Sequence, residues 1–174
     1  LFAEILQRYH KLDGIIHAAG IIADGPANTK SLATFQDVLR AKVRGTWILQ
    51  QLARRHSVDF LVGFSAIASV FGTPGQVDYA TGNAYLDAAL ASDLSAGSLR
   101  TLSLAWGAWS DVGMAAHTGT DRRLVAQGWS AITPERGRAL FASALQHPRP
   151  LQIVFHRNDP KKGPVPFVQR RISQ

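Results

Sequence analysis

The chain has 174 residues, of which 46% are hydrophobic and 18% are charged, with a formal net charge of +7 and no cysteine. This length can bury a sizeable core and is most simply one domain. The lack of cysteine excludes disulfides and thiolate metal ligands, and it fits a reducing, cytoplasmic setting. No stretch approaches the roughly 20 apolar residues of a membrane span, and no leader pattern is present, so no membrane partner is expected.

Basic residues gather in the later part of the chain. They fit either a solvated surface or a face that meets an acidic partner, since complementary charge accelerates encounter. Dense basic runs interleaved with aromatic residues are missing, so nucleic acid is not an expected partner. The six histidines are scattered without metal-ligand spacing, so no metal site is expected. The basic positions are Arg122-Arg123, Arg136, Arg138, Lys161-Lys162 and Arg170-Arg171.

Apolar strands alternate with helical patterns along the chain. Such alternation predicts an α/β fold with a parallel, doubly wound sheet, here with about four strands. Proline at position 134 suits the first turn of a helix. In order, the expected elements are the end of a helix at 1–10, a strand at 12–17, a helix at 31–55, a strand at 59–65, a helix at 77–96 ending near Gly97, a strand at 100–105, an irregular region at 107–133 with room for a short helix at 120–127, a helix at 134–146 and a strand at 151–156.

Two of the expected helices carry residues that suit proton transfer. Lys42 shares a stripe of helix 31–55 with Phe35, Leu39 and Val43, which is the side expected to be buried. Tyr79 and Asn83 stand four residues apart in helix 77–96 and should project from one face. An ammonium close to a phenol favours the ionised phenol, so a lysine–tyrosine pair in one crevice can protonate a carbonyl. The alternative is a core tyrosine, a surface amide and a lysine whose stem lies along the surface.

Three segments carry a family resemblance: IIHAAGIIADG at 15–25, FLVGFSAIASVFGTPGQVDYATGNAYLDAAL at 60–90 and LSLAWGAWSDVGM at 102–114. In this order and spacing, the chain resembles the ketoreductase domain of modular polyketide synthases, an extended short-chain dehydrogenase/reductase. The resemblance runs through nearly the whole chain. It implies a Rossmann-like fold and the NADPH-dependent reduction of a β-ketoacyl thioester carried on an acyl carrier protein.

The resemblance also assigns roles by position. Lys42, Tyr79 and Asn83 match the family's lysine, proton-donating tyrosine and asparagine, whereas the serine position, thirteen residues before the tyrosine, holds Ala66. Alanine cannot donate a hydrogen bond to the substrate carbonyl, a loss that typically costs about 100- to 1,000-fold in turnover. Ser65 is a candidate substitute, but strand alternation should turn it away from Tyr79. Ala66 fits either a natural pseudo-reductase with a structural role or an engineered substitution.

Further positions are implied for the cofactor and the substrate. Family members that deliver hydride to one face of the ketone carry an aspartate in the loop after HAAG, and this chain has Asp24 there. Members that deliver it to the other face tend to have a tryptophan where this chain has Phe71. This pattern favours the B type, which gives a D-configured alcohol; Asp24 is alternatively a simple turn residue. Met114 lies in the segment that resembles a mobile substrate lid. The expected cofactor-binding residues are Ala18, Ala19, Gly20, Lys42, Tyr79, Trp106 and Gly107, with packing as the alternative role of the tryptophans.

The glycine-rich turn that holds the cofactor pyrophosphate in this family is missing from the chain. Residues 1–158 are therefore interpreted as the C-terminal part of a ketoreductase domain, and 159–174 as a linker or docked tail. The expected partners are the N-terminal half of the same domain, neighbouring synthase domains and the acyl carrier protein. The strand at 12–17 should consequently have one edge unpaired within this chain.

Overall fold

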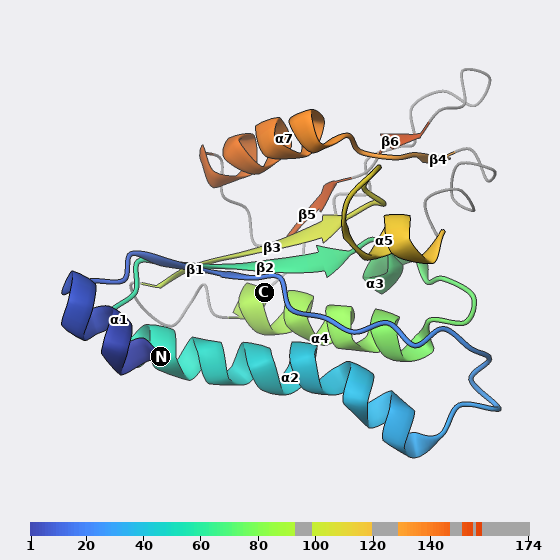
Figure 1. Ribbon diagram of the computed structural model, residues 1–174, viewed down its shortest axis with the longest axis horizontal. Coiled ribbons are helices and arrows are strands. Elements are labelled where there is room, and N and C mark those ends of the chain that lie inside the picture. Colours follow the sequence, from blue (N-terminus) through green and yellow to red (C-terminus); the bar gives the residue numbers. More distant parts are fainter. Residues whose placement is uncertain (93–98, 120–128, 147–150, 155, 158–174) are drawn as a thin grey trace.

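A four-stranded parallel sheet runs through the centre of the computed structural model, which describes residues 1–92, 99–119, 129–146, 151–154 and 156–157. The strand order is β1-β2-β3-β5, and each neighbouring pair is parallel (Figure 1). The doubly wound α/β expectation is therefore confirmed. The strands are β1 (Gly14–His17), β2 (Phe60–Ala66), β3 (Arg100–Trp106) and β5 (Leu151–Val154).

Helices cover both faces of this sheet (Figure 1). α2 (Leu32–Arg55) and α4 (Val77–Ser92) lie together on one face, and α7 (Pro134–Gln146) lies on the other. The short α1 (Phe2–Tyr9) precedes β1. α2 begins where the sequence predicts, because the Ser31 side chain accepts a hydrogen bond from the Thr34 amide at 3.1 Å and caps the first turn.

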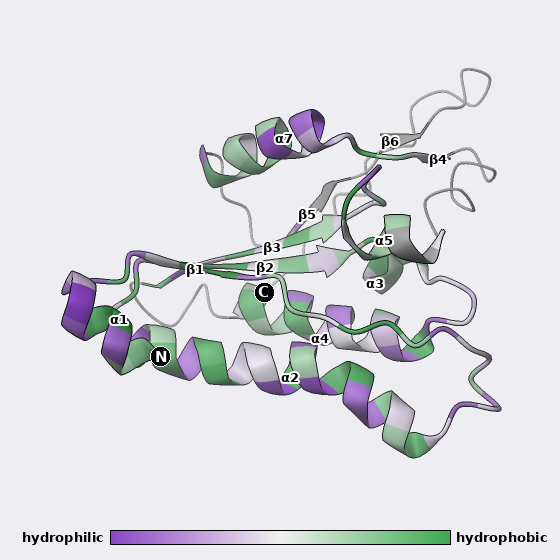
Figure 2. Cartoon of the chain, viewed as in Figure 1, coloured by the Kyte–Doolittle hydropathy of each residue, from purple (hydrophilic) through white to green (hydrophobic). Residues whose placement is uncertain are grey.

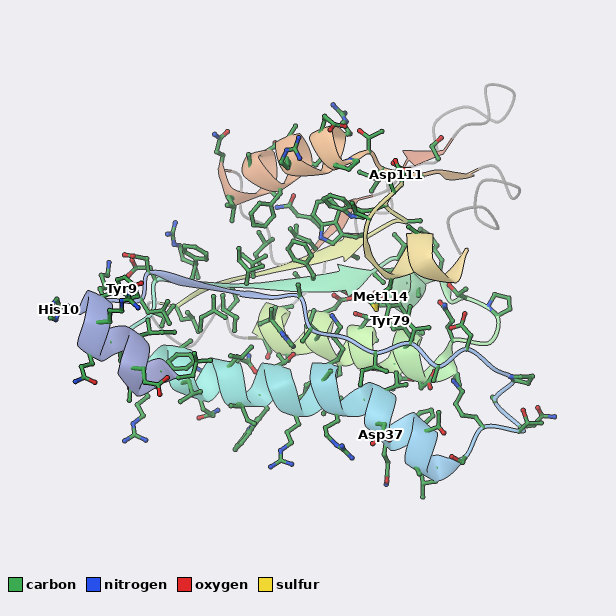
Figure 3. The ribbon with its side chains drawn as sticks, in the orientation of Figure 1. Tyr9, His10, Asp37, Tyr79, Asp111 and Met114 are labelled. Carbon is green, nitrogen blue, oxygen red and sulfur yellow. The ribbon has the colours of Figure 1, made fainter. Side chains whose placement is uncertain are left out.

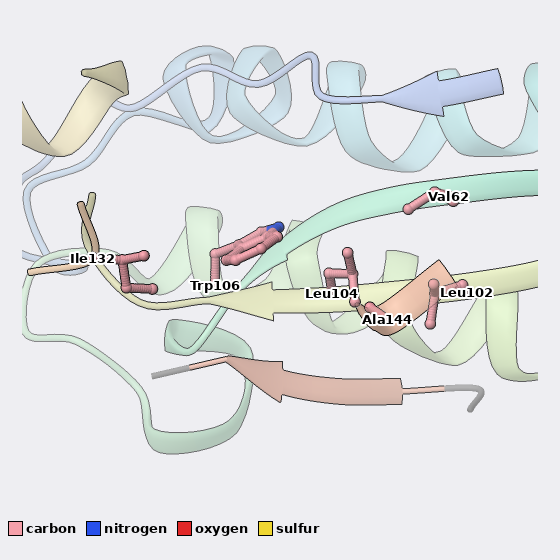
Figure 4. Packing of buried hydrophobic residues seen from close by; sticks show 6 residues of the cluster. All are labelled: Val62, Leu102, Leu104, Trp106, Ile132 and Ala144. Carbon is pink, nitrogen blue, oxygen red and sulfur yellow. The ribbon is translucent and has the colours of Figure 1, made fainter. Parts of the chain in front are cut away.

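The two faces of the sheet bury separate apolar clusters. Towards α7 lie Val62, Leu102, Leu104, Trp106, Ile132 and Ala144 (Figure 4). Towards α2 and α4 lie Ala53, Val58, Leu61, Leu86, Leu90 and Leu99. Gly63 lets α4 pack closely against β2, because a Cβ at this position would stand only 2.6 Å from Leu90 Cδ1. Successive side chains of β2 thus pack into the two clusters in turn, as expected for a parallel sheet that is covered on both faces.

α2 carries both hydrophilic and hydrophobic residues along its length (Figure 2). Its buried stripe is more polar than the sequence pattern predicted and consists of Val38, Lys42, Thr46, Gln50 and Ala53. Phe35, Leu39 and Val43 are only half-buried. The burial of Lys42 was predicted correctly, but the centre of the buried face lies one residue away from the expected stripe. No helix in the described part of the chain is long and apolar enough to cross a membrane.

The region 107–133 is more regular than predicted. It contains α5 (Gly113–Thr118) and β4 (Trp129–Ser130), and β4 pairs antiparallel with β6 (His156–Arg157). The strand expected at 151–156 is accordingly divided between β5 and β6, which belong to different sheets. α3 (Ala68–Phe71) was not predicted, because a single helical turn gives no periodic signal.

Other expectations lie partly outside the described residues. These are the short helix at 120–127, the end of helix 77–96 near Gly97 and the tail at 159–174.

At the β1 edge of the sheet, β1 pairs with β2 alone among the described strands. The expected unpaired edge of this strand is therefore present in the described part of the chain.

Candidate active site

The carboxyl ends of the parallel strands meet at one edge of the sheet, and the candidate residues gather there. β1 leads into residues 18–20, and β2 ends at Ala66. Helices α3 and α5 lie beside this edge (Figure 1). Figure 3 shows Tyr79 of α4 and Met114 of α5 in the same region. In open α/β sheets, ligands bind in the crevice outside this edge.

Lys42 reaches the sheet from α2 and is only 4% exposed. Its Nζ donates a hydrogen bond to the carbonyl oxygen of Phe64 at 2.5 Å. A Cβ at Gly20 would stand 3.4 Å from Lys42 Cε and 3.8 Å from Nζ, so this glycine lets the loop after β1 lie against the lysine. Burial lowers the pKa of Lys42 to about 8, although the charge of Asp87 opposes the change. The observed partner of the buried cation is thus a strand carbonyl, with the charge of Asp87 acting on it.

Tyr79 and Asn83 occupy one face of α4. Asn83 is fully buried, and its Nδ2 donates to the Tyr79 carbonyl oxygen at 2.8 Å. Its Oδ1 has no hydrogen-bond partner among the described residues. Burial raises the pKa of Tyr79, a side-chain hydrogen bond with Asn83 lowers it, and the charge of Asp24 raises it. The direction is opposite to the one expected from Lys42, because desolvation dominates and the lysine is directed to the Phe64 carbonyl.

Ala66 ends β2 with its methyl group buried and 8% of the residue exposed. Its carbonyl oxygen accepts a hydrogen bond from Ser69 Oγ at 2.9 Å, so only the backbone of this residue makes a polar contact. Ser65 is also buried, and its hydroxyl lies 3.5 Å from the Asn83 carbonyl oxygen and hydrogen-bonds Asp87. The neighbouring hydroxyl is thus engaged between β2 and α4. That Ser65 turns away from Tyr79 stays a prediction.

Asp87 is a buried acid that the sequence reasoning missed. It accepts hydrogen bonds at 2.5 Å from Ser103 Oγ of β3 and from Ser69 Oγ of α3. Burial raises its pKa, while these hydroxyls and the charge of Lys42 lower it. Asp87 follows Asn83 by four residues, so the helical spacing that singled out the first two polar residues of α4 could have found this third one.

The loop that contains Asp24 lies against the segment before α4. Gln76 Nε2 donates to Asp24 Oδ1 at 2.9 Å, and the Gly25 amide donates to the Gly75 carbonyl oxygen at 2.9 Å. Asp24 is thus held by a side-chain partner, and its role in choosing the hydride face stays a prediction. The sequence reasoning did not identify Gln76, since its partner is 52 residues away.

The loop predicted to bind the cofactor, residues 18–20, is partly exposed, and its contact with a cofactor stays a prediction. Ala18 and Ala19 are exposed, and Gly20 is half-buried between Lys42 and Met114. A Cβ at Gly20 would stand 3.6 Å from Met114 Cε, so the structure brings the first residues of α5 close to this loop. Gly107, at the end of β3, is half-buried.

The indole of Trp106 belongs to the apolar cluster beneath α7. It is 5% exposed, and its ring lies 5.0 Å from that of Trp109 and 5.5 Å from that of Phe64, measured between centroids. The packing alternative therefore describes this side chain, and a cofactor contact of Trp106 stays a prediction. Phe71, at the end of α3, is 48% exposed.

A pocket lies beside this site, between the loop after β1 and the first half of α2. None of the candidate catalytic residues lines it. Its lining residues are Ile21, Ala23, Thr34, Asp37, Val38, Arg40 and Ala41. Within the described ranges, no group of three or more histidine, aspartate and glutamate side chains is arranged to hold a metal ion.

Comparison with known proteins gives consistent matches. The KR domain family matches residues 1–111. The spectinabilin polyketide synthase system protein NorB of Streptomyces orinoci is 38% identical over 174 residues, which cover 94% of this chain and 8% of that protein. A type I polyketide synthase of phenolphthiocerol synthesis from Mycobacterium bovis is 36% identical over 157 residues, which cover 88% of this chain and 7% of that protein.

Solved ketoreductases have the same fold. A structure of A-type ketoreductases from a modular polyketide synthase matches with a TM-score of 0.77 and 35% identity, covering 84% of this chain and 31% of that one. A ketoreductase domain from the bacillaene assembly line matches with a TM-score of 0.81 and 29% identity, and the match covers 90% of this chain and 39% of that one. A short-chain dehydrogenase from Streptomyces avermitilis, 19% identical with a TM-score of 0.68, shares the fold. The chain thus spans less than half of these ketoreductase chains and a small part of the synthases.

Proposed function

Because the chain belongs to the ketoreductase family of modular polyketide synthases, we propose that it forms the catalytic part of a reductase that converts a β-ketoacyl thioester to the β-hydroxyacyl product with NADPH. The observation that carries this proposal is the placement of Lys42. This buried cation lies between Gly20, in the loop after β1, and the helix of Tyr79 and Asn83. Buried ionisable groups with shifted pKa values gather at functional sites, which makes Lys42 a candidate for a functional role.

The residues present fit a nicotinamide cofactor. Gly20 allows close approach of the backbone, and the Lys42 ammonium offers donors beside it. The buried Asn83 Oδ1 has no partner among the described residues, so this oxygen still has its capacity to accept a hydrogen bond. Lys42 and Tyr79 would hold the nicotinamide ribose, with residues 18–20 beside it. When bound, NADPH supplies the hydride.

Tyr79 would supply the proton to the ketone oxygen. Its raised pKa keeps the phenol protonated at neutral pH, so the proton is available. With a pKa of about 8, Lys42 is mostly cationic at pH 7, and its charge would favour the phenolate that remains after transfer once the ammonium turns from the Phe64 carbonyl oxygen towards the phenol. Asn83 would order the relay that returns a proton to Tyr79.

A second candidate function is a pseudo-ketoreductase that braces the synthase. The buried methyl group of Ala66 favours it, because the family uses a serine hydroxyl there as a second donor to the ketone. A relative from Mycobacterium tuberculosis, 35% identical over 157 residues, carries the word inactive in its name. Substituting serine by alanine removes a hydroxyl and leaves the packing intact, so both functions are compatible with the fold.

The partners follow from the same proposal. The acyl chain would arrive on an acyl carrier protein in the cytoplasm, and the pyrophosphate end of the cofactor would be held by the N-terminal half of the reductase domain. Arg136 and Arg138 are exposed on α7 and could face an acidic carrier, while the other late basic residues lie outside the described ranges. Neighbouring synthase domains would supply the β-ketoacyl chain and receive the alcohol.

The test uses the polypeptide that includes the glycine-rich half, with NADPH and a β-ketoacyl thioester of a small thiol. Tyr79→Phe should lower the reduction rate by at least about 100-fold, because the proton donor is lost, while fluorescence still reports NADPH binding. Tyr9→Phe, at a tyrosine that is 63% exposed on α1, is the matched control and should change nothing. Equal rates for the Tyr79→Phe and unmodified polypeptides would refute the assignment of Tyr79. Failure to bind NADPH would favour the structural function.

A further inference from the structure

One ion pair in the described part of the chain is buried. Lys30 Nζ lies 2.6 Å from Asp78 Oδ2, and the two side chains are only 4% and 1% exposed. The same Nζ donates to the carbonyl oxygen of Ala23 at 2.5 Å. Taking two charges out of water is costly, and the cost is recovered only with good geometry and additional hydrogen bonds. Both conditions hold here, since the lysine has two close acceptors.

This ion pair connects two segments that flank the proposed site. Ala23 directly precedes Asp24, in the loop after β1. Asp78 is in the first turn of α4, and its Oδ1 accepts a hydrogen bond from the Tyr79 amide at 2.9 Å. Lys30 therefore links the carbonyl before Asp24 to the carboxylate that contacts the backbone of Tyr79.

Two further hydrogen bonds join the same segments. Gln76 holds the Asp24 carboxylate, and the Gly25 amide donates to the Gly75 carbonyl oxygen. We call these contacts, together with the Lys30–Asp78 pair, the loop clamp. Other lysine ion pairs in the described ranges lie at the surface, for example Lys11 with Asp59, where the side chains are 60% and 48% exposed. The buried pair is thus placed where the loop meets the tyrosine helix.

We propose that Lys30 and Asp78 are positioning residues that fix the Asp24 loop against the helix of Tyr79, and thereby determine which face of the β-keto group is reduced. This inference rests on the proposed function. A ketone can present either face when its acyl chain lies in either of two directions beside the proton donor. A loop held at a fixed position next to Tyr79 leaves room for the acyl chain in one direction, whereas a loosened loop admits the acyl chain in both directions. The substrate class is a β-ketoacyl thioester.

The test compares Lys30→Met with Lys11→Met, which removes the exposed lysine and serves as the control, in the polypeptide that includes the glycine-rich half. A double variant, Lys30→Met with Asp78→Asn, removes both charges and keeps an acceptor for the Tyr79 amide. It avoids an unpaired buried carboxylate, so it should fold even if the single variant does not. All variants are also made in the Ala66→Ser background, so that product formation can be followed.

The first readout is amide hydrogen exchange in the segments 22–26 and 76–80. Both Lys30 variants should exchange at least about 10-fold faster there, while Lys11→Met should match the unmodified polypeptide. The second readout is the ratio of the two alcohol configurations by chiral chromatography. Loosening the loop should shift this ratio by about 10-fold towards the minor product, a change that a merely structural contact would not produce.

Unchanged exchange in both Lys30 variants would overturn the loop clamp. Faster exchange with an unchanged product ratio would overturn its role in selecting the face. If the polypeptide reduces no ketone with either alanine or serine at position 66, the proposed function fails, and the exchange measurement still decides whether the clamp exists. The two failures are therefore distinguishable.

Discussion

At position 66, a buried alanine ends β2, at the position proposed to correspond to the family's serine. The backbone of Ala66 is in place, since its carbonyl oxygen accepts a bond from Ser69 Oγ at 2.9 Å. The neighbouring Ser65 has its hydroxyl engaged with Asp87 and the Asn83 carbonyl oxygen. A serine at position 66 would therefore add one free donor to a strand end that is already formed.

Ala66→Ser should raise NADPH-dependent ketone reduction by about 100-fold or more, if the lost donor limits the reaction. The measurement is the steady-state rate of the polypeptide that includes the glycine-rich half. Ser65→Ala is the companion variant and should leave the rate of the Ala66→Ser polypeptide nearly unchanged. A large loss from Ser65→Ala in the unmodified polypeptide would instead identify Ser65 as the working donor.

The titration of Lys42 should make stability depend on pH. Its pKa is lowered from 10.5 to about 8 in the folded chain, so between these values the unfolded chain binds more protons. Stability contributed by this residue therefore rises with pH through that window, by about 2–3 kcal/mol up to about pH 10. Urea unfolding of the reductase domain should show this rise, and Lys42→Met should lack it. Identical pH profiles for both proteins would contradict the lowered pKa.

At the scale of elements, α4 is the helix that organises the site. Tyr79, Asn83 and Asp87 are spaced by four residues, so they follow one face of the helix towards the sheet. Asp87 joins this helix to β3 through Ser103 and to α3 through Ser69. The polar cluster thus fixes the helix relative to the strand ends, while the apolar contacts of Leu86 and Leu90 anchor its second half.

Asp87→Ala should lower the free energy of unfolding by about 3 kcal/mol, because it leaves buried hydroxyls without an acceptor. Asp87→Asn should cost less, since an amide oxygen can still accept hydrogen bonds from the serine hydroxyls around it. The control is Asp37→Ala, at an exposed pair with Arg40, which should stay within about 0.5 kcal/mol of the unmodified protein. Chemical denaturation measures all three. A cost for Asp87→Ala no larger than that of the control would show that the cluster does not stabilise the fold.

At the scale of the whole molecule, the sheet has an open side. β1 pairs with β2 alone among the described strands, so one row of its backbone groups has no strand partner there. The solved ketoreductase chains that match are about two to three times longer than the part this chain covers, with coverage of 31% and 39%. The additional polypeptide of such a domain can complete the sheet.

We predict that the amides of β1 which point away from β2 exchange at least about 10-fold more slowly when the glycine-rich half is present than in residues 1–174 alone. Strand pairing on the open side would protect them. Amides of β2, already paired on both sides, serve as the internal reference and should change less. Equal exchange of the β1 amides in both polypeptides would show that the second half does not pair with this strand.

Much of the fold followed from the sequence, because the apolar periods are clear. Helix 134–146 was predicted with the bounds it has, and the strand at 59–65 is displaced by one residue. Motif spacing also predicted Lys42, Tyr79 and Asn83 as catalytic residues and Ala66 as the occupant of the family's serine position, and these assignments stay predictions. These features depend on local pattern and on position along the chain, which a sequence contains in full.

Only the tertiary structure decided the features that depend on distant residues meeting. The Lys30–Asp78 pair and the Gln76–Asp24 bond join residues 48 and 52 positions apart, and no local pattern specifies such contacts. The direction of the Tyr79 pKa was likewise set by burial, a quantity fixed by everything that packs around the phenol. The sequence by itself therefore determined the elements and the candidate residue types, while packing determined the partners of these residues, their protonation and the placement of the Asp24 loop.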